Sequence, residues 1–182
     1  TAPKDGNELR NLLATATTLN RSFSIRYPKG SSRKFDIDKA PEILTIGTWE
    51  QLTKGSRIAI LATGSMVGIV EDNLNAISEA LDFSPTLINA RFIKPLDKSM
   101  LVSLCEEYDA ILTMEEGCLA GGFGSAVIEH YNDIGRSVKI ARMGIPDDFI
   151  QHGSREELLD NLGLNSIGIV NKIKDILGDL HE

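Results

Sequence analysis

Three segments place charged, polar or glycine residues directly after strand-like apolar runs, where a chemical site is expected. The first follows Thr63, the second spans Arg91 to Asp97, and the third runs from Glu115 to Ser125. In open α/β sheets, ligands bind beyond the carboxyl ends of the parallel strands. We therefore expect these three segments to meet at one edge of a sheet, and we look for a ligand site there.

The segment Glu115–Ser125 carries four glycines and opens a predicted helix. Glycines at a helix N-terminus can present backbone N–H groups to a phosphate. The pattern departs from a dinucleotide fingerprint, because Val127 stands where a third glycine or alanine is needed. Two carboxylates at the mouth of the segment would also repel a phosphate. A tight turn that packs a helix onto the sheet is the favoured interpretation, and nucleotide binding is the alternative.

Glu115 and Glu116 are candidates for general acid–base catalysis. Adjacent residues at a strand end point to opposite sides, so the two carboxyls are not expected to share a proton. A structural ion pair is the favoured role. We expect Arg91 to pair with one of them, because it leaves a strand end that should be their neighbour and a partly buried carboxylate needs a partner.

Arg26 and Lys29 place two cations on either side of Tyr27-Pro28, at the end of a predicted strand. A basic pair of this kind can bind a phosphate or a carboxylate. Among the histidines, only His152 lies in a predicted loop, just before a helix cap. The sequence fixes no nucleophile beside it, so we interpret it as a surface or interface residue.

Strand-like and helix-like segments alternate along most of the chain. Helices are predicted from Asp5, Ser65, Asp97, the glycine-rich segment, Ser154 and Ser166, and strands at 22–27, 43–46, 48–52, 58–63, 86–89, 110–114 and 138–143. Alternation of this kind predicts an α/β fold with three layers, α/β/α, around a mostly parallel sheet. The short strands before residue 57 are expected at a sheet edge, which we predict to be antiparallel.

Composition narrows the functional classes. The chain has 182 residues and a net charge of −7, which argues against a nucleic-acid partner. No apolar run approaches the ~20 residues that span a bilayer, so no membrane partner is expected. Cys105 and Cys118 form neither a disulfide scaffold nor a zinc ligand set, and a cytoplasmic location is expected. Because the chain begins at Thr1 rather than Met, we expect a piece of a longer protein.

Five segments together resemble 1-deoxy-D-xylulose-5-phosphate synthases in order and spacing. They are Ala2–Arg10, Ile25–Gly30, Ala90–Asp97, Glu115-Glu116 with Gly121–Ser125, and Gly144–Ile150. The Arg-Tyr-Pro and Arg-x-x-x-Pro-Leu-Asp elements are shared with transketolases and with β subunits of 2-oxoacid dehydrogenases, so they indicate only the superfamily. The Gly-Ile-Pro-Asp-x-Phe-Ile segment and the helix through Leu162–Leu164 favour the synthase.

The resemblance implies a thiamine-diphosphate-dependent transferase that condenses pyruvate with glyceraldehyde 3-phosphate and releases carbon dioxide. Its product feeds isoprenoid, thiamine and pyridoxal synthesis. Such enzymes use a divalent metal, usually magnesium, and act as homodimers. By the resemblance, residues 1–30 are the tail of a pyrimidine-binding domain (a helix plus a strand), residues 31–41 are a linker, and residues 42–182 are a transketolase-type C-terminal domain.

The resemblance assigns no catalytic, cofactor-binding or metal-binding residue to this chain, because the Gly-Asp-Gly motif, the pyrimidine-contacting Glu and the histidine-rich segments are absent from it. Lys29 matches an Arg that helps to hold the aldehyde's phosphate, and Arg26 is a second candidate contact. We expect the segment to support folding and dimer assembly, with the rest of the same polypeptide as its partner, and to be inactive alone. The alternatives are a standalone C-terminal half of a split transketolase, a 2-oxoacid dehydrogenase β-type subunit, and a nucleotide-binding Rossmann protein.

Overall fold

A five-stranded sheet organises the protein, whose computed structural model describes residues 1–178. The elements in chain order are α1 (Gly6–Thr17), β1 (Glu50–Thr53), β2 (Ile58–Ala62), α2 (Ser65–Leu81), β3 (Thr86–Asn89), α3 (Lys98–Glu107), β4 (Ala110–Cys118), α4 (Phe123–Asp133), β5 (Lys139–Ile145), α5 (Arg155–Asn161) and α6 (Ser166–Gly178). The strand order is β1-β3-β2-β4-β5, with β1 antiparallel to β3 and the other pairs parallel. The predicted α/β fold with an antiparallel edge is confirmed.

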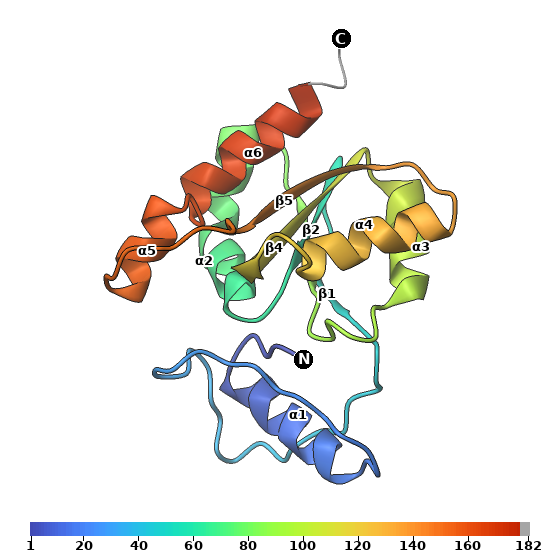
Figure 1. Ribbon diagram of the computed structural model, residues 1–182, viewed down its shortest axis with the longest axis vertical. Helices are drawn as coiled ribbons and strands as arrows, with labels where there is room; N and C mark the ends of the chain where they lie inside the picture. The colour runs from blue at the N-terminus through green and yellow to red at the C-terminus, as the bar shows by residue number, and fades with distance from the viewer. Residues whose placement is uncertain (179–182) are drawn as a thin grey trace.

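Helices cover both faces of the sheet (Figure 1). Ile58 and Ile60 of β2 pack with the buried side chains of α2 and α6 on one face. Ala59 and Leu61 pack on the other face, with buried side chains of α1, α3 and α4. Every residue of β2 is buried, as expected for a central parallel strand that is covered on both sides.

Side-chain caps begin three of the helices, and the sequence predicts a helix start at each of the three capping residues. Asp5 accepts a hydrogen bond from the Glu8 backbone N–H at the start of α1. Asp97 does the same for Met100 at the start of α3. Ser154 and Glu157 form a reciprocal capping box at α5, which confirms that prediction. These bonds satisfy backbone N–H groups that the first turn of a helix leaves without partners.

Two predicted strands are absent. Residues 22–27 belong to no strand, and the backbone hydrogen bonds they form in the described chain are with Thr1: the Thr1 N-terminus donates to Ser24 O (2.9 Å) and Arg26 N donates to Thr1 O (2.9 Å). Residues 43–46 also lie outside the sheet, and Leu44 N donates to the Thr15 hydroxyl of α1. Both predictions are wrong. An alternating pattern indicates only that one face of a segment is buried, and it does not show whether a second strand lies beside the segment to form backbone hydrogen bonds.

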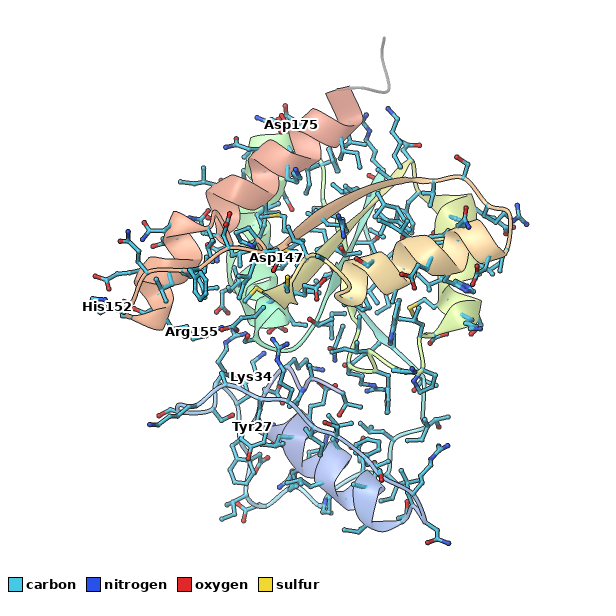
Figure 2. All side chains as sticks on the ribbon, viewed as in Figure 1. Tyr27, Lys34, Asp147, His152, Arg155 and Asp175 are labelled. Atoms are coloured by element: carbon cyan, nitrogen blue, oxygen red, sulfur yellow. The ribbon has the colours of Figure 1, made fainter. Side chains whose placement is uncertain are left out.

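The polar stretch 31–41 is anchored to α2 by charge. Arg33 forms ion pairs with Glu71 and Asp72, and Lys34 Nζ lies 3.0 Å from Glu71. Gly68 leaves the space that the Arg33 guanidinium occupies against α2, since a Cβ at this position would overlap it. Figure 2 labels Lys34 where the N-terminal part of the chain meets this end of the sheet domain. The division into residues 1–30, 31–41 and 42–182 stays a prediction.

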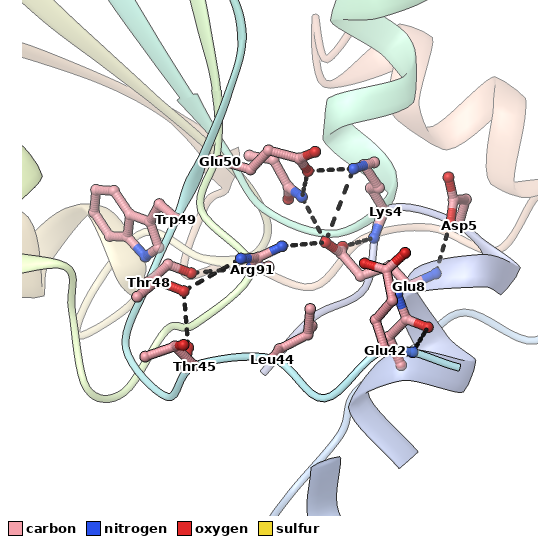
Figure 3. A network of polar contacts seen from close by, with 12 residues as sticks. Lys4, Asp5, Glu8, Glu42, Leu44, Thr45, Thr48, Trp49, Glu50 and Arg91 are labelled. Atoms are coloured by element: carbon pink, nitrogen blue, oxygen red, sulfur yellow. Dashed lines mark hydrogen bonds and ion pairs between the residues drawn. The ribbon is translucent and has the colours of Figure 1, made fainter. Parts of the chain in front are cut away.

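A buried polar cluster joins α1 to the sheet (Figure 3). Glu8 is 4% exposed and accepts hydrogen bonds from Lys4 N (2.7 Å) and from the Asn89 amide at the end of β3 (2.7 Å). Arg91 Nη1 lies 3.7 Å from the same carboxylate. Glu50 of β1 joins the cluster by accepting from Lys4 Nζ and Asn89.

Burial raises the pKa of Glu8, and the neighbouring Lys4, Asn89 and Arg91 only partly oppose this effect. The carboxylate of Glu50 is less buried, and there the bonds from Lys4 and Asn89 outweigh desolvation, so the pKa of Glu50 is lowered. The pKa values of the two acids therefore shift in opposite directions, because the Glu8 carboxylate has lost more of its contact with water.

We predict that Glu8→Ala lowers the free energy of unfolding by about 3–5 kcal/mol, because the change removes the buried charge that faces Arg91 and the acceptor of the Lys4 N–H and the Asn89 amide. Urea unfolding followed by circular dichroism measures this. Glu42→Ala is the matched control, since Glu42 forms an exposed ion pair with Lys39 (2.9 Å). The control should change the free energy of unfolding by less than about 1 kcal/mol. Equal effects of the two substitutions would contradict the role given to Glu8.

Candidate functional site

A cleft of ≈ 220 Å³ lies at the carboxyl ends of the central strands. Thr63, Gly64 and Ser65 follow β2 there, and Glu115 and Glu116 belong to β4. The chain leaves β2 toward β3 on one side and leaves β4 toward β5 on the other. The cleft is thus at the topological switch point, where open α/β sheets bind ligands.

The N-terminal tail forms the remaining wall of this cleft. Ala2 is buried, and Arg26, Tyr27 and Pro28 line the opening. The side chain of Arg26 forms no hydrogen bond or ion pair within the described part of the chain. Lys29 is exposed and does not line the cleft. The structure therefore brings one of the two predicted phosphate contacts to the cleft, and the roles of both remain predictions.

Glu115 is bound by the N-terminus of α4. Its two carboxylate oxygens accept hydrogen bonds from Phe123 N (2.8 Å) and Gly124 N (2.9 Å), and the residue is 6% exposed. Gly122 allows this approach, because a Cβ at that position would overlap the Glu115 carboxylate. A helix N-terminus favours a negative charge, and here the protein supplies the anion itself. This agrees with the tight-turn interpretation of the glycine-rich segment.

Glu116 points the other way, as expected for the next residue in a strand. It accepts hydrogen bonds from Ser65 Oγ (2.6 Å) and from Arg155 Nε (2.9 Å) and Nη2 (2.6 Å). Partial burial raises the pKa of Glu116, but the bonds from Arg155 and Ser65 outweigh it and hold that pKa below its usual range. The sequence predicted a structural ion pair but not this partner, because Arg155 is 39 residues away.

The predicted pairing of Arg91 with Glu115 or Glu116 is wrong. Arg91 donates from Nε to Thr48 O (2.9 Å) and from Nη2 to Thr48 Oγ1 (3.2 Å), and its charge faces Glu8. Arg91 follows β3, and β2 separates β3 from β4 in the sheet. Arg91 therefore turns toward β1, the other neighbour of β3, rather than toward the glutamates.

The paired carboxylates are used for structure, which leaves little for acid–base chemistry in the cleft. Two features of the cleft oppose a diphosphate there: Glu115 already accepts from the α4 N-terminus, and Glu116 adds a second negative charge. Within residues 1–178, no group of three or more His, Cys, Asp or Glu side chains is placed to hold a metal ion. His152 is exposed in the loop before α5, as predicted for a surface residue. No helix in the same part of the chain is long and apolar enough to cross a membrane.

The family model for the transketolase C-terminal domain matches residues 47–169. The chain belongs to this family. The match begins just before β1 and ends inside α6, so it includes the whole sheet and both walls of the cleft that β2 and β4 provide.

Curated relatives extend the similarity over the tail. The chain is 38% identical over 97% of its length to the 1-deoxy-D-xylulose-5-phosphate synthase of Symbiobacterium thermophilum, and 41% identical over 96% to that of Shouchella clausii. The synthase of Dehalococcoides mccartyi is 35% identical over the full chain. The chain spans about 27–28% of the length of these relatives.

Solved structures show the same fold. A split-gene transketolase, described as an inactive beta4 tetramer, gives a TM-score of 0.86 at 23% identity and covers 97% of this chain and 57% of that one. A transketolase mutant from Pichia stipitis gives a TM-score of 0.54 at 17% identity and covers 72% of this chain and 18% of that one. These likenesses support the predicted three-layer architecture.

We predict that Glu115→Ala lowers the free energy of unfolding by about 1–3 kcal/mol, because two buried backbone N–H groups lose their acceptor. Glu129→Ala is the control, since Glu129 is an exposed residue of the same helix with no ion pair in the described chain. It should leave urea unfolding almost unchanged. A loss for Glu115→Ala no larger than that of the control would show that the α4 N-terminus does not depend on this carboxylate.

Proposed function

We propose that this chain is the C-terminal segment of a thiamine-diphosphate-dependent 1-deoxy-D-xylulose-5-phosphate synthase. The full protein would condense pyruvate with glyceraldehyde 3-phosphate and release carbon dioxide. The observation that carries the proposal is identity of 35–41% with synthases over almost the whole chain, including residues 1–46 that lie outside the transketolase C-terminal match.

The segment would act by positioning rather than by chemistry. Its cleft carboxylates are held by the α4 N-terminus and by Arg155, and the Glu8 cluster fixes the tail against the sheet. We therefore assign thiamine diphosphate and magnesium to the remainder of the protein, together with the catalytic residues. The assembled enzyme would be a cytoplasmic homodimer.

The second candidate is a separate C-terminal subunit of a split transketolase. The TM-score of 0.86 with the split-gene transketolase favours it, since that similarity also covers 97% of this chain. The identity is only 23%, against 38% for a synthase over the same share of the chain. The intact mass of the natural protein decides, because a split subunit is a short polypeptide and a synthase is several times longer.

We predict that the 182-residue chain alone does not bind thiamine diphosphate at micromolar concentration. The cleft presents carboxylates where a diphosphate would need cations or free N–H groups. Isothermal titration calorimetry with the cofactor and magnesium measures this, with the full-length protein as the positive control. Micromolar binding by the chain alone would overturn the assignment of the cofactor to the remainder.

We predict that Lys29 binds the phosphate of glyceraldehyde 3-phosphate in the full-length protein. Loss of a charge-assisted hydrogen bond costs about 1.5–3 kcal/mol. Lys29→Ala should therefore lower kcat/KM for the phosphorylated acceptor roughly ten- to a hundredfold. Lys29→Arg should preserve or raise it, because a guanidinium can bind two phosphate oxygens at once.

The unphosphorylated aldehyde is the control acceptor for both variants. It should be nearly indifferent to either substitution, since it offers no phosphate to the cation. Steady-state kinetics with equal losses for both acceptors, or with no loss for either, would show that Lys29 is only a solvated charge.

A further inference from the structure

Residues 27–33, which include Lys29, cross an open cleft between the tail and α2. This second cleft has a volume of ≈ 220 Å³, and residues of the crossing segment line one side of it while Gly68 and Ile69 of α2 line another. Figure 2 labels Tyr27 at the start of the segment and Lys34 just after it. Lys29 is exposed and lines neither this cleft nor the one at the strand ends. The segment therefore spans a cavity at this point instead of packing on the sheet domain.

Polar contacts hold the segment 27–33 only at its two ends. Before it, Arg26 N donates to Thr1 O (2.9 Å). After it, Lys34 O accepts from Asn7 N (3.2 Å). Between these points, residues 27–31 form no hydrogen bond or ion pair within residues 1–178. The position of Lys29 therefore depends on how firmly the ends of the segment are held.

Arg33 binds the end of the segment to α2. Its guanidinium forms ion pairs with Glu71 and Asp72, and it lies against the helix backbone at Gly68, where a Cβ would overlap it. Glu71 and Asp72 follow Gly68 by three and four residues, so the three positions share one face of the helix. Glycine within a helix is less favourable than alanine. At this position, however, glycine leaves the space that the guanidinium occupies.

The chemistry of this contact suits an arginine. A guanidinium is planar and carries several N–H groups, so it can lie close to the helix and still donate to two carboxylates. The side chains of Arg33 and Glu71 are each 33% exposed, and that of Asp72 is 60% exposed. Ion pairs with this exposure contribute little to folding stability. We therefore expect the contact to affect the position of the segment more than the free energy of unfolding.

We infer that Arg33 is a positioning residue for Lys29. Its contact with α2 fixes the segment 27–33, so that the Lys29 ammonium is held where the phosphate of the acceptor binds. The inference rests on the proposed synthase function and on the phosphate contact proposed for Lys29. Arg33 does not bind the phosphate itself, because its charge already faces two carboxylates of α2.

Limited proteolysis of the full-length protein tests the contact without an enzyme assay. Trypsin cleaves after Lys29, and mass spectrometry measures how fast this bond is cut. Arg33→Ala should raise the rate about tenfold, because the segment loses its contact with α2 and opens more often. Gly68→Ala should also raise the rate, because the added methyl group displaces the guanidinium.

Two comparisons identify the cause of a faster cut. In a protein that already carries Arg33→Ala, Gly68→Ala should cause no further rise, because both changes remove the same contact. Gly178→Ala is the matched control, since a Cβ at Gly178 meets no other atom within 4 Å. It should leave the rate of cleavage after Lys29 unchanged. Urea unfolding should have nearly the same midpoint for all these variants.

Steady-state kinetics test the link from Arg33 to Lys29. Arg33→Ala should lower kcat/KM for the phosphorylated acceptor about three- to tenfold, mainly by raising KM, and should leave the unphosphorylated aldehyde almost unaffected. In a Lys29→Ala background, Arg33→Ala should cause no further loss, because Arg33 acts through Lys29. A general structural defect would instead lower the rates with both acceptors.

The contact and the role given to it can fail separately. Equal cleavage rates for the unchanged protein and for Arg33→Ala would overturn the contact. Faster cleavage without a change in preference between the two acceptors would overturn the positioning of Lys29. A full-length protein that converts neither acceptor would overturn the proposed function and the role of Lys29 with it, whereas the proteolysis would still decide the contact.

Discussion

The carboxylate of Glu8 needs compensation from several segments at once, because an unpaired charge inside a protein costs several kcal/mol. Lys4 precedes α1, Asn89 ends β3, and Arg91 lies just after that strand. The carboxylate can meet all three in only one position, so α1 is fixed against the sheet. This position also sets Ala2 and Arg26 over the ends of β2 and β4. The buried charge of Glu8 therefore holds in place the tail residues that complete the wall of the cleft at the switch point.

Features that depend on neighbouring residues could be predicted from the sequence. The apolar run of β2, the caps at Asp5 and Ser154, and the alternation of strands with helices all follow from local chemistry. Strand order depends on contacts between distant segments, and the failed pairing of Arg91 shows the consequence. The sequence places Arg91 and Glu115 after consecutive parallel strands, but the crossover from β3 to β4 passes over β2. The strands β3 and β4, which are consecutive in the sequence, are thus separated by β2 in the sheet.

In the candidate site, too, local features could be predicted from the sequence, whereas contacts between distant segments could not. The opposite directions of Glu115 and Glu116 follow from the two-residue repeat of a strand, which the sequence does reveal. The partners of these acids do not follow from it. Arg155 reaches Glu116 only because α5 returns to the carboxyl ends of the strands after the loop at residues 146–154. The extension of β4 to Cys118 was also missed, because Gly117 lowers strand propensity while the pairing of Cys118 with Ile145 maintains the strand.

The charges of the cleft residues determine which ligands the ends of β2 and β4 can attract. Ligand sites at strand ends usually offer free helix N-termini and uncommitted charges. In this chain the α4 N-terminus is filled by Glu115, and Ser65 at the start of α2 donates to Glu116. Arg26 is the cation at the cleft whose side chain has no hydrogen-bonding or ion-pairing partner within residues 1–178. It stands on the tail rather than on the sheet, in the segment whose similarity to the synthases lies outside the transketolase C-terminal match. The carboxylates of β4 therefore disfavour an anion at the strand ends, and Arg26 on the tail is the side chain of this cleft that can attract one.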